Sequence, residues 1–217
     1  MSFLRPGGAH PGWPEPVGPI KVAAGVVRLR PVRMRDAAQW SRLRVADREF
    51  LEPWEPTAEL EWNARHGISA WPSVCSAVRA EARRGRMLPY VIEVDGRFGG
   101  QLTVGNVTHG ALRSAWIGYW VHSELTGGGV ATGALALGLD HCFGVLRLHR
   151  MEATVRPENT ASRKVLAKVG FREEGLLKRY LDVDGAWRDH LLVGLTVEEV
   201  RGSVVARLVH AGRARWV

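Results

Sequence analysis

The chain reads Thr126-Gly127-Gly128-Gly129-Val130-Ala131-Thr132 at the point where a strand pattern gives way to a helix pattern. The strand pattern is the apolar, aromatic run Trp116–Val121, and the helix pattern continues to Phe143. A glycine-rich turn at the start of a helix presents unpaired backbone N–H groups at the positive end of the helix dipole, and both attract phosphate. Adjacent glycines also leave no Cβ atoms to keep a diphosphate away from the backbone. The stretch therefore predicts a strand–turn–helix unit that binds a phosphorylated cofactor, and hence an enzyme.

Strand and helix patterns alternate on both sides of this turn. The expected strands cover residues 26–30, 90–94, 98–104, 116–121, 151–155, 175–181 and 187–195. The expected helices cover residues 59–66, 73–84, 129–143 and 159–169. Two more helices are expected to begin at capping boxes, one at Asp36 with Gln39 and one at Thr196 with Glu199. This order predicts an α/β (α+β) fold in which antiparallel strands come first, then a strand–helix–strand–helix segment, then a final hairpin.

The domain organisation follows from local composition. Residues 1–20 are dense in glycine and proline and are expected to form an irregular arm that adds nothing to a core. Residues 21–200 are expected to form one domain, and residues 201–217 a C-terminal helix or tail. A single last amphipathic helix is expected from Thr196 to Arg207, with its apolar side formed by Val197, Val200, Val204 and Leu208. It docks on its own domain or on a second subunit, so both a monomer and a homodimer remain open.

The overall composition favours a cytoplasmic protein. Apolar residues make up 46% of the 217 residues, which supports a packed core. The chain has no apolar run near the roughly 20 residues that span a bilayer, and no secretory signal is recognisable at its start. Cys75 and Cys142 lack the spacing of a metal site or a redox pair, so they are expected to be reduced and buried. The net charge of +8 is spread along the chain, so we expect neither a direct nucleic-acid partner nor a membrane partner.

Taken together, these motifs resemble the GNAT N-acetyltransferases, and within them the RimJ/RimL type that acetylates protein N-termini. The cofactor signature Gln/Arg-x-x-Gly-x-Gly/Ala corresponds to Thr126–Ala131. The second signature, an asparagine at a helix start followed by Gly-Phe, corresponds to Asn159 and Gly170-Phe171. Three further motifs common in this subgroup are Ile117–Trp120, Pro53–Pro56 and Gly185–Asp189. The resemblance covers roughly residues 22 to 200.

The resemblance implies a fold and a cofactor. The fold is a central, mixed, mostly antiparallel and twisted sheet that the cofactor splits into a V, with helices on both sides. The cofactor is acetyl-CoA, whose diphosphate would lie on the backbone amides of the glycine turn. The residues that would bind it are Trp120, Val121, His122, Thr126, Gly127, Gly128, Gly129, Val130, Ala131, Thr132, Asn159 and Ser162.

The resemblance also implies catalytic roles. Many relatives carry a tyrosine as the acid for the departing thiolate, but here that position is Leu166, and Ser162 matches the serine that takes its place in this subgroup. Many relatives also carry a glutamate just before the Ile-Gly-Tyr-Trp motif, where this chain has Trp116. The remaining candidates for the base are His122 and Glu124, with Glu152 or a relaying water as further possibilities. The acceptor is expected to contact Trp54, Glu55 and Tyr119.

The function expected from all of this is transfer of an acetyl group from acetyl-CoA to the N-terminal α-amine of a protein, such as a ribosomal protein. Both substrates would bind together, and the amine would attack the thioester directly. A small amine such as a polyamine or an amino sugar is the first alternative, and an acidic acceptor pocket would favour it. A non-catalytic domain that senses acyl-CoA is the second. No metal is expected, because the histidines at positions 109, 141, 149 and 190 lack metal-site spacing and are interpreted as structural.

Overall fold

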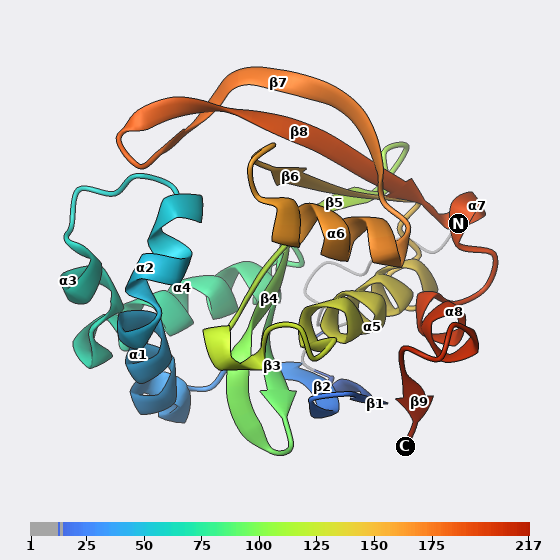
Figure 1. Cartoon of the computed structure of the whole chain (residues 1–217), viewed down its shortest axis with the longest axis horizontal. Coiled ribbons are helices and arrows are strands. Elements are labelled where there is room, and N and C mark those ends of the chain that lie inside the picture. The colour runs from blue at the N-terminus through green and yellow to red at the C-terminus, as the bar shows by residue number, and fades with distance from the viewer. Residues whose placement is uncertain (1–12, 14) are drawn as a thin grey trace.

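One sheet of nine strands organises the chain in the computed structural model, which describes residues 13 and 15–217 (Figure 1). The strands are β1 (Val17–Val22), β2 (Gly25–Pro31), β3 (Leu88–Val94), β4 (Arg97–Thr108), β5 (Ser114–Val121), β6 (Arg150–Val155), β7 (Arg172–Val183), β8 (Ala186–Thr196) and β9 (Arg215–Trp216). The helices are α1 (Ala37–Ala46), α2 (Arg48–Leu51), α3 (Trp62–His66), α4 (Trp71–Arg83), α5 (Val130–Gly144), α6 (Thr160–Val169), α7 (Val197–Val200) and α8 (Val204–His210). Short 3₁₀ turns are η1 (Met34–Asp36), η2 (Glu52–Trp54), η3 (Ile68–Ala70) and η4 (Ser123–Leu125).

The sheet divides at its single parallel pair. The strand order is β7-β8-β6-β5-β4-β3-β2-β1-β9, and every neighbouring pair is antiparallel except β5 and β6. Those two strands pair only from Ser114↔Arg150 to Trp116↔Glu152. Beyond this point residues 117–121 and 153–155 run on as strands without pairing to each other. The predicted mixed, mostly antiparallel sheet that opens into a V is therefore confirmed.

Helices cover both faces of the sheet. Helix α5 contacts β1, β2, β4 and β5, and it connects the parallel strands β5 and β6 as a crossover helix. It is buried on nearly all sides because α6 and α8 pack against it from outside. Helix α4 packs against β3, and α1–α4 gather on the side away from α5 (Figure 1). The β7–β8 hairpin arches over the split (Figure 1).

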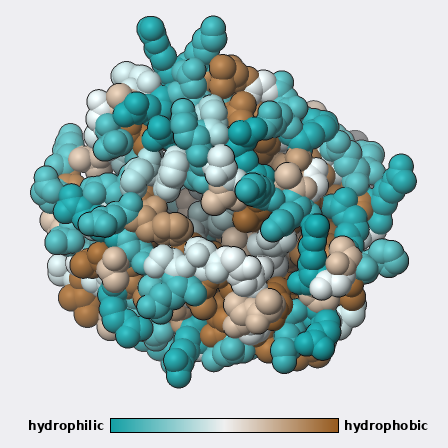
Figure 2. All heavy atoms as spheres, viewed as in Figure 1, coloured by the Kyte–Doolittle hydropathy of each residue, from teal (hydrophilic) through white to brown (hydrophobic). Residues whose placement is uncertain are grey.

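The surface seen with α5, α6 and α8 in front is mostly hydrophilic, and apolar residues appear on it in small separate groups (Figure 2). Across the described residues, every helix is too short or too polar to cross a membrane.

Several local predictions are confirmed. Asp95 and Gly96 both have positive φ, 46° and 79°, and close the β3–β4 hairpin. Asn159 caps α6 by accepting a hydrogen bond from the Ser162 N–H, and Gly170 ends the helix with a φ of 105°. The capping box that joins Thr196 and Glu199 is also present. Both cysteines are free and buried.

Two predictions about the ends of the chain are wrong. The expected irregular arm is not irregular throughout, because β1 begins at Val17 and Trp13 is buried against Tyr90 with ring centroids 5.9 Å apart. The rest of that expectation, on residues 1–12 and 14, lies outside the described residues. The single last helix is instead two, α7 and α8, because Arg201 and Gly202 adopt positive φ and Ser203 caps α8 anew.

Two helix starts also differ from the prediction. Asp36 does not cap α1, since its carboxylate accepts from the Arg33 N–H and forms an ion pair with buried Arg30. Gln39 accepts a hydrogen bond from the Phe98 N–H instead of completing a capping box. The helix expected from residue 59 begins only at Trp62.

Candidate active site

The glycine turn presents a row of unpaired donors. Within the part of the chain that the structure describes, the backbone N–H groups of residues 127–132 donate no hydrogen bond, whereas those of Thr126 and Gly133 on either side donate to Ser123 and Gly129. Gly127 and Gly129 have φ of 76° and 84°, which turns successive N–H groups toward solvent at the start of the helix. Free N–H groups at a helix start are the donors that an anion site requires.

The turn is fixed against the β1–β2 hairpin. The Ala24 N–H donates to the Gly128 carbonyl at 3.0 Å, and a Cβ atom on Gly128 would lie 2.5 Å from the Cβ of Ala24. This close approach requires glycine at position 128. Thr126 donates its hydroxyl to the Ser123 carbonyl within the same turn, so its side chain stabilises the loop.

A cavity of about 160 Å³ opens where β5 and β6 separate. Its walls come from the η2 loop, both separating strands, the first turns of α6 and the middle of β8. The lining residues are Trp54, Ile117, Gly118, Tyr119, Ala153, Thr154, Val155, Arg156, Asn159, Ser162, Leu166 and His190. The cavity thus joins four of the sequence-predicted site residues, which are Trp54, Tyr119, Asn159 and Ser162.

Two hydroxyl groups meet in this cavity. The Tyr119 hydroxyl lies 2.9 Å from the Ser162 hydroxyl oxygen, and Asn159 orients the serine by accepting its N–H at 3.0 Å. Burial raises the pKa of Tyr119 to about 12, although the hydrogen bond with Ser162 acts in the opposite direction. The phenol therefore stays protonated at neutral pH and can donate. Leu166 lines the same cavity, so the two hydroxyls lie in the space that position 166 also borders.

His190 is a cavity residue that the sequence analysis interprets only as structural. It is buried, and its Nδ1 lies 3.1 Å from the Arg188 carbonyl oxygen. This hydrogen bond assigns the proton to Nδ1 and leaves Nε2 as the acceptor. The ring of Tyr180 packs on the histidine at 5.6 Å between centroids. The sequence cue for His190 is its position directly after the Gly185–Asp189 motif.

The two predicted candidates for the base lie elsewhere. His122 holds Asp47 through Nδ1 at 2.8 Å, and Glu124 is 85% exposed. Burial alone would raise the pKa of Asp47, but hydrogen bonds from Ser123 and His122 outweigh it and lower that pKa. Neither His122 nor Glu124 lines the cavity, and their catalytic roles stay predictions. Glu152 forms an ion pair with Arg150.

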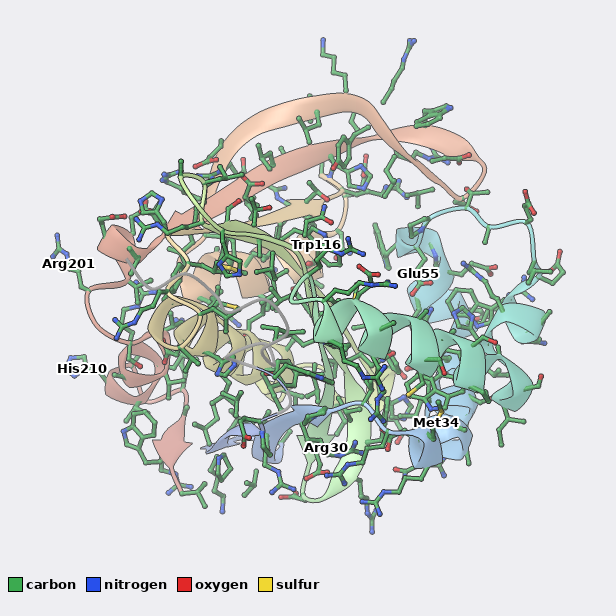
Figure 3. All side chains as sticks on the ribbon, turned by 180° about the vertical axis from the view of Figure 1, so that it is seen from behind. Arg30, Met34, Glu55, Trp116, Arg201 and His210 are labelled. Carbon is green, nitrogen blue, oxygen red and sulfur yellow. The ribbon has the colours of Figure 1, made fainter. Side chains whose placement is uncertain are left out.

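Of the three predicted acceptor residues, Trp54 and Tyr119 line the cavity and Glu55 does not. Trp54 lines the cavity, and the Arg156 guanidinium stacks over its ring at 5.3 Å. Glu55 does not line the cavity, because its carboxylate forms an ion pair with buried Arg44. Figure 3 places Glu55 beside the helices of the first half of the chain. Of the predicted cofactor residues in β5, Val121 is buried, and Trp120 donates its indole N–H to Gln101.

Comparison with known proteins identifies the enzyme class. Residues 27–172, well over half of the chain, match the acetyltransferase (GNAT) domain family. The chain therefore belongs to the GNAT acetyltransferases, as the motifs predict. Within the described residues, no group of three or more His, Cys, Asp or Glu side chains is arranged to hold a metal ion.

Particular relatives are similar over most of their length. The structure of Mycobacterium smegmatis RimJ in complex with CoA-disulfide is 72% identical, superposes with a TM-score of 0.95, and matches 96% of this chain and 100% of that one. The [ribosomal protein uS5]-alanine N-acetyltransferase of Escherichia coli is 27% identical over 190 residues, which is 87% of this chain and 96% of the relative. The probable N-acetyltransferase YjcK of Bacillus subtilis is 29% identical over 173 residues, 78% of this chain and 93% of the relative.

Proposed function

We propose that this protein transfers an acetyl group from acetyl-CoA to the N-terminal α-amine of a protein, with a ribosomal protein as the acceptor type. The observation that carries the proposal is the Tyr119–Ser162 hydroxyl pair, which lies in the cavity where the sheet divides. The relatives support it, since one was solved with a CoA disulfide and another is named for the alanine of a ribosomal protein. We further propose that the enzyme acts in the cytoplasm as a monomer or homodimer, without nucleic acid or membrane.

The residues present fit coenzyme A. The free N–H groups of residues 127–132 suit a diphosphate. The edge of β5 beyond Trp116 is not paired with β6, so its backbone groups are available to the amides of the pantetheine arm. Asn159 lies at the same opening. When bound, acetyl-CoA would supply an acetyl group activated as a thioester.

Three side chains of the cavity, Tyr119, Ser162 and His190, would carry out the proton transfers of the reaction. Tyr119 and Ser162 hold a proton in the cavity for the departing sulfur. An N-terminal amine has a reference pKa near 7.7–8.0, so a useful fraction is neutral at physiological pH, whereas a lysine amine near 10.4 needs far more help. His190 accepts the amine proton at Nε2, because its Nδ1–H is already bonded to the backbone. His122 and Glu124 are the competing candidates.

The lining of the cavity argues against a polyamine acceptor. Among the described residues that line it, none carries a carboxylate, and its one arginine, Arg156, is already paired with Glu158 at 3.3 Å. A polycation would find no carboxylate in the cavity lining to attract it, whereas a peptide presents a single amine and a neutral backbone. The spermidine N(1)-acetyltransferase of Escherichia coli is 31% identical over only 100 residues, 46% of this chain.

One experiment separates the three candidate functions. The protein is incubated with acetyl-CoA and peptides that differ in their first residue, with spermidine and an amino sugar in parallel, and the products are identified by intact mass. Acetylation of peptide α-amines supports the proposal. Acetylation of small amines alone would support the first alternative, and tight binding of CoA without any product would support the acyl-CoA sensor.

A further inference from the structure

A second hollow, of about 560 Å³, adjoins the glycine turn on the surface of α5. Its floor includes Gly127–Gly129, Thr132 and Gly133. Its walls come from β1, the end of α6, and the segment that follows α8. These walls bring together four exposed cations that are far apart in the sequence: Lys21, Lys168, Arg213 and Arg215. We call this hollow the basic groove. No Asp or Glu is found among the described residues that line it.

The cations of the basic groove lack counter-charges. Throughout residues 13 and 15–217, none of the four forms an ion pair. Lys21 and Arg215 stand directly opposite each other in the antiparallel β1–β9 pair, which places like charges on one face of the sheet. That arrangement is unfavourable by itself, and an anion between the two side chains would relieve it. The groove therefore has the electrostatics of an anion site.

The basic groove also continues the phosphate site. It shares Gly127–Gly129 with the turn whose N–H groups are free, so it begins where the proposed function places a diphosphate. Beyond its diphosphate, coenzyme A carries an adenosine with a 3′-phosphate. A phosphate monoester has a charge of about −1.5 to −2 at pH 7, and arginine binds it through two parallel hydrogen bonds.

Most of the basic groove lies outside the part of the chain that matches the family. Lys21 precedes residues 27–172, and Arg213 and Arg215 follow them. Arg213 and Arg215 are exposed on either side of buried Ala214, which anchors the segment in the core. The pairing of β9 with β1 then holds this segment beside the glycine turn.

We propose that the basic groove binds the 3′-phosphate of coenzyme A, with Arg213 and Arg215 as the main contacts and Lys21 and Lys168 beside them. This inference rests on the proposed function, because it takes coenzyme A as the ligand. It assigns the C-terminal segment a role in the site, as the wall that distinguishes coenzyme A from dephospho-coenzyme A, which lacks only that phosphate.

The test is calorimetric titration with coenzyme A and with dephospho-coenzyme A. The wild-type protein is expected to bind coenzyme A more tightly. In Arg213→Gln/Arg215→Gln, coenzyme A is expected to lose roughly 10- to 100-fold in affinity, while dephospho-coenzyme A keeps its affinity. Arg201→Gln is the matched control, because Arg201 is an exposed arginine of the C-terminal segment that does not line the groove (Figure 3). It is expected to bind both ligands as the wild type does.

Unchanged binding of dephospho-coenzyme A also shows that the double variant is folded. Equal losses for both ligands would overturn the inference, because the arginines would then act on the diphosphate or on the fold. Equal wild-type affinities for the two ligands would overturn it too, while leaving the proposed function in place. Binding of neither ligand by the wild type would contradict the proposed function itself.

Discussion

Tyr119 and Ser162 reach the cavity from different elements, β5 and α6, and their hydroxyl oxygens lie 2.9 Å apart. Two hydroxyls in contact can pass one proton between them, so we expect them to act as a unit. The resemblance assigns the thiolate role to Ser162 alone and places Tyr119 with the acceptor. In the structure both residues line the same cavity.

Removing either hydroxyl tests this pairing. Ser162→Ala and Tyr119→Phe are each expected to lower kcat roughly 100-fold, because the departing sulfur loses its proton source. The double variant is expected to lose little more than either single one, since both residues serve one proton. Steady-state kinetics give kcat, and calorimetry with coenzyme A should show affinities within a few-fold of wild type. Losses that multiply in the double variant would show that the two hydroxyls act independently.

His190 is tested against His122 with the same substitution. His190→Gln is expected to lower kcat/KM roughly 100-fold at pH 7, and the deficit should narrow above about pH 8, where an α-amine is already neutral. His122→Gln, the matched variant at the other candidate base, is expected to leave the pH profile of kcat/KM unchanged. A large deficit in His122→Gln with none in His190→Gln would restore the sequence-based assignment.

His66 is a buried histidine whose charge state affects stability. Burial, followed by the nearby positive charges of Arg44 and Arg65, lowers its pKa to about 3. The unfolded chain, with a histidine pKa near 6.5, therefore binds more protons than the folded one between these two values. The contribution of His66 to the free energy of unfolding is therefore greatest above pH 6.5. It decreases as the pH falls toward 3, by up to about 1.4 kcal/mol per pH unit.

Urea unfolding at pH 7 and pH 5 measures this effect. His66→Gln keeps an acceptor for the Arg44 guanidinium, which lies 2.6 Å from the His66 Nε2, but it cannot be protonated. The variant is expected to lose less free energy of unfolding between the two pH values than the wild type does. An equal loss in both proteins would show that His66 is not the group responsible.

At the scale of elements, the glycine turn combines two different demands on its residues. Gly127 needs a positive φ of 76° but has open space where a Cβ would lie. Gly128 has no such backbone demand, yet a Cβ there would meet Ala24 at 2.5 Å. One glycine is required for conformation and the other for close packing.

Alanine at each position separates these demands. Gly127→Ala is expected to lower the free energy of unfolding by roughly 1–2 kcal/mol through backbone strain. Gly128→Ala is expected to lower the free energy of unfolding by roughly 1–3 kcal/mol through overpacking. Because the turn must then move, this variant is also expected to lose more affinity for coenzyme A than Gly127→Ala does. Urea unfolding and calorimetry measure the two effects. A weaker effect of Gly128→Ala on coenzyme A would contradict the fixed position of the turn.

Elements with strong local signals could be predicted from the sequence. Asp95-Gly96 fixed the β3–β4 hairpin, and Asn159 with Gly170 fixed both ends of α6. Asp36 was expected to cap α1, but its carboxylate forms an ion pair with Arg30 of β2 instead. The local helix-start pattern around Asp36 does not indicate this contact. The break before α8 was not predicted, because valines at helical spacing occur on both sides of it. That pattern does not indicate the positive φ of Arg201 and Gly202.

At the scale of the whole molecule, the cavity depends on the place where β5 and β6 stop pairing. That register is set by tertiary packing and leaves no local pattern in the sequence. The same limit explains why two features were not predicted. One is His190, which reaches the cavity from β8, and the other is the basic groove, whose cations come from both ends of the chain and from α6. The family resemblance supplied Ser162 and Asn159, whose positions the fold then brought together.

The N-terminal region contributes to the core of the whole molecule, contrary to the sequence-based expectation. Trp13 is only 9% exposed and packs on Tyr90. Trp13→Ala is therefore expected to lower the free energy of unfolding by roughly 3–5 kcal/mol. Trp216→Ala, at a tryptophan that is 61% exposed, is the control and should change it by less than about 0.5 kcal/mol. Equal values in urea unfolding would show that residue 13 is dispensable for the core.

A crystal structure with bound coenzyme A tests the central claim most directly. The account predicts the diphosphate on the backbone N–H groups of residues 127–132, and the sulfur within hydrogen-bonding distance of Ser162 or Tyr119. A diphosphate bound elsewhere, or a sulfur far from the opening between β5 and β6, would contradict it.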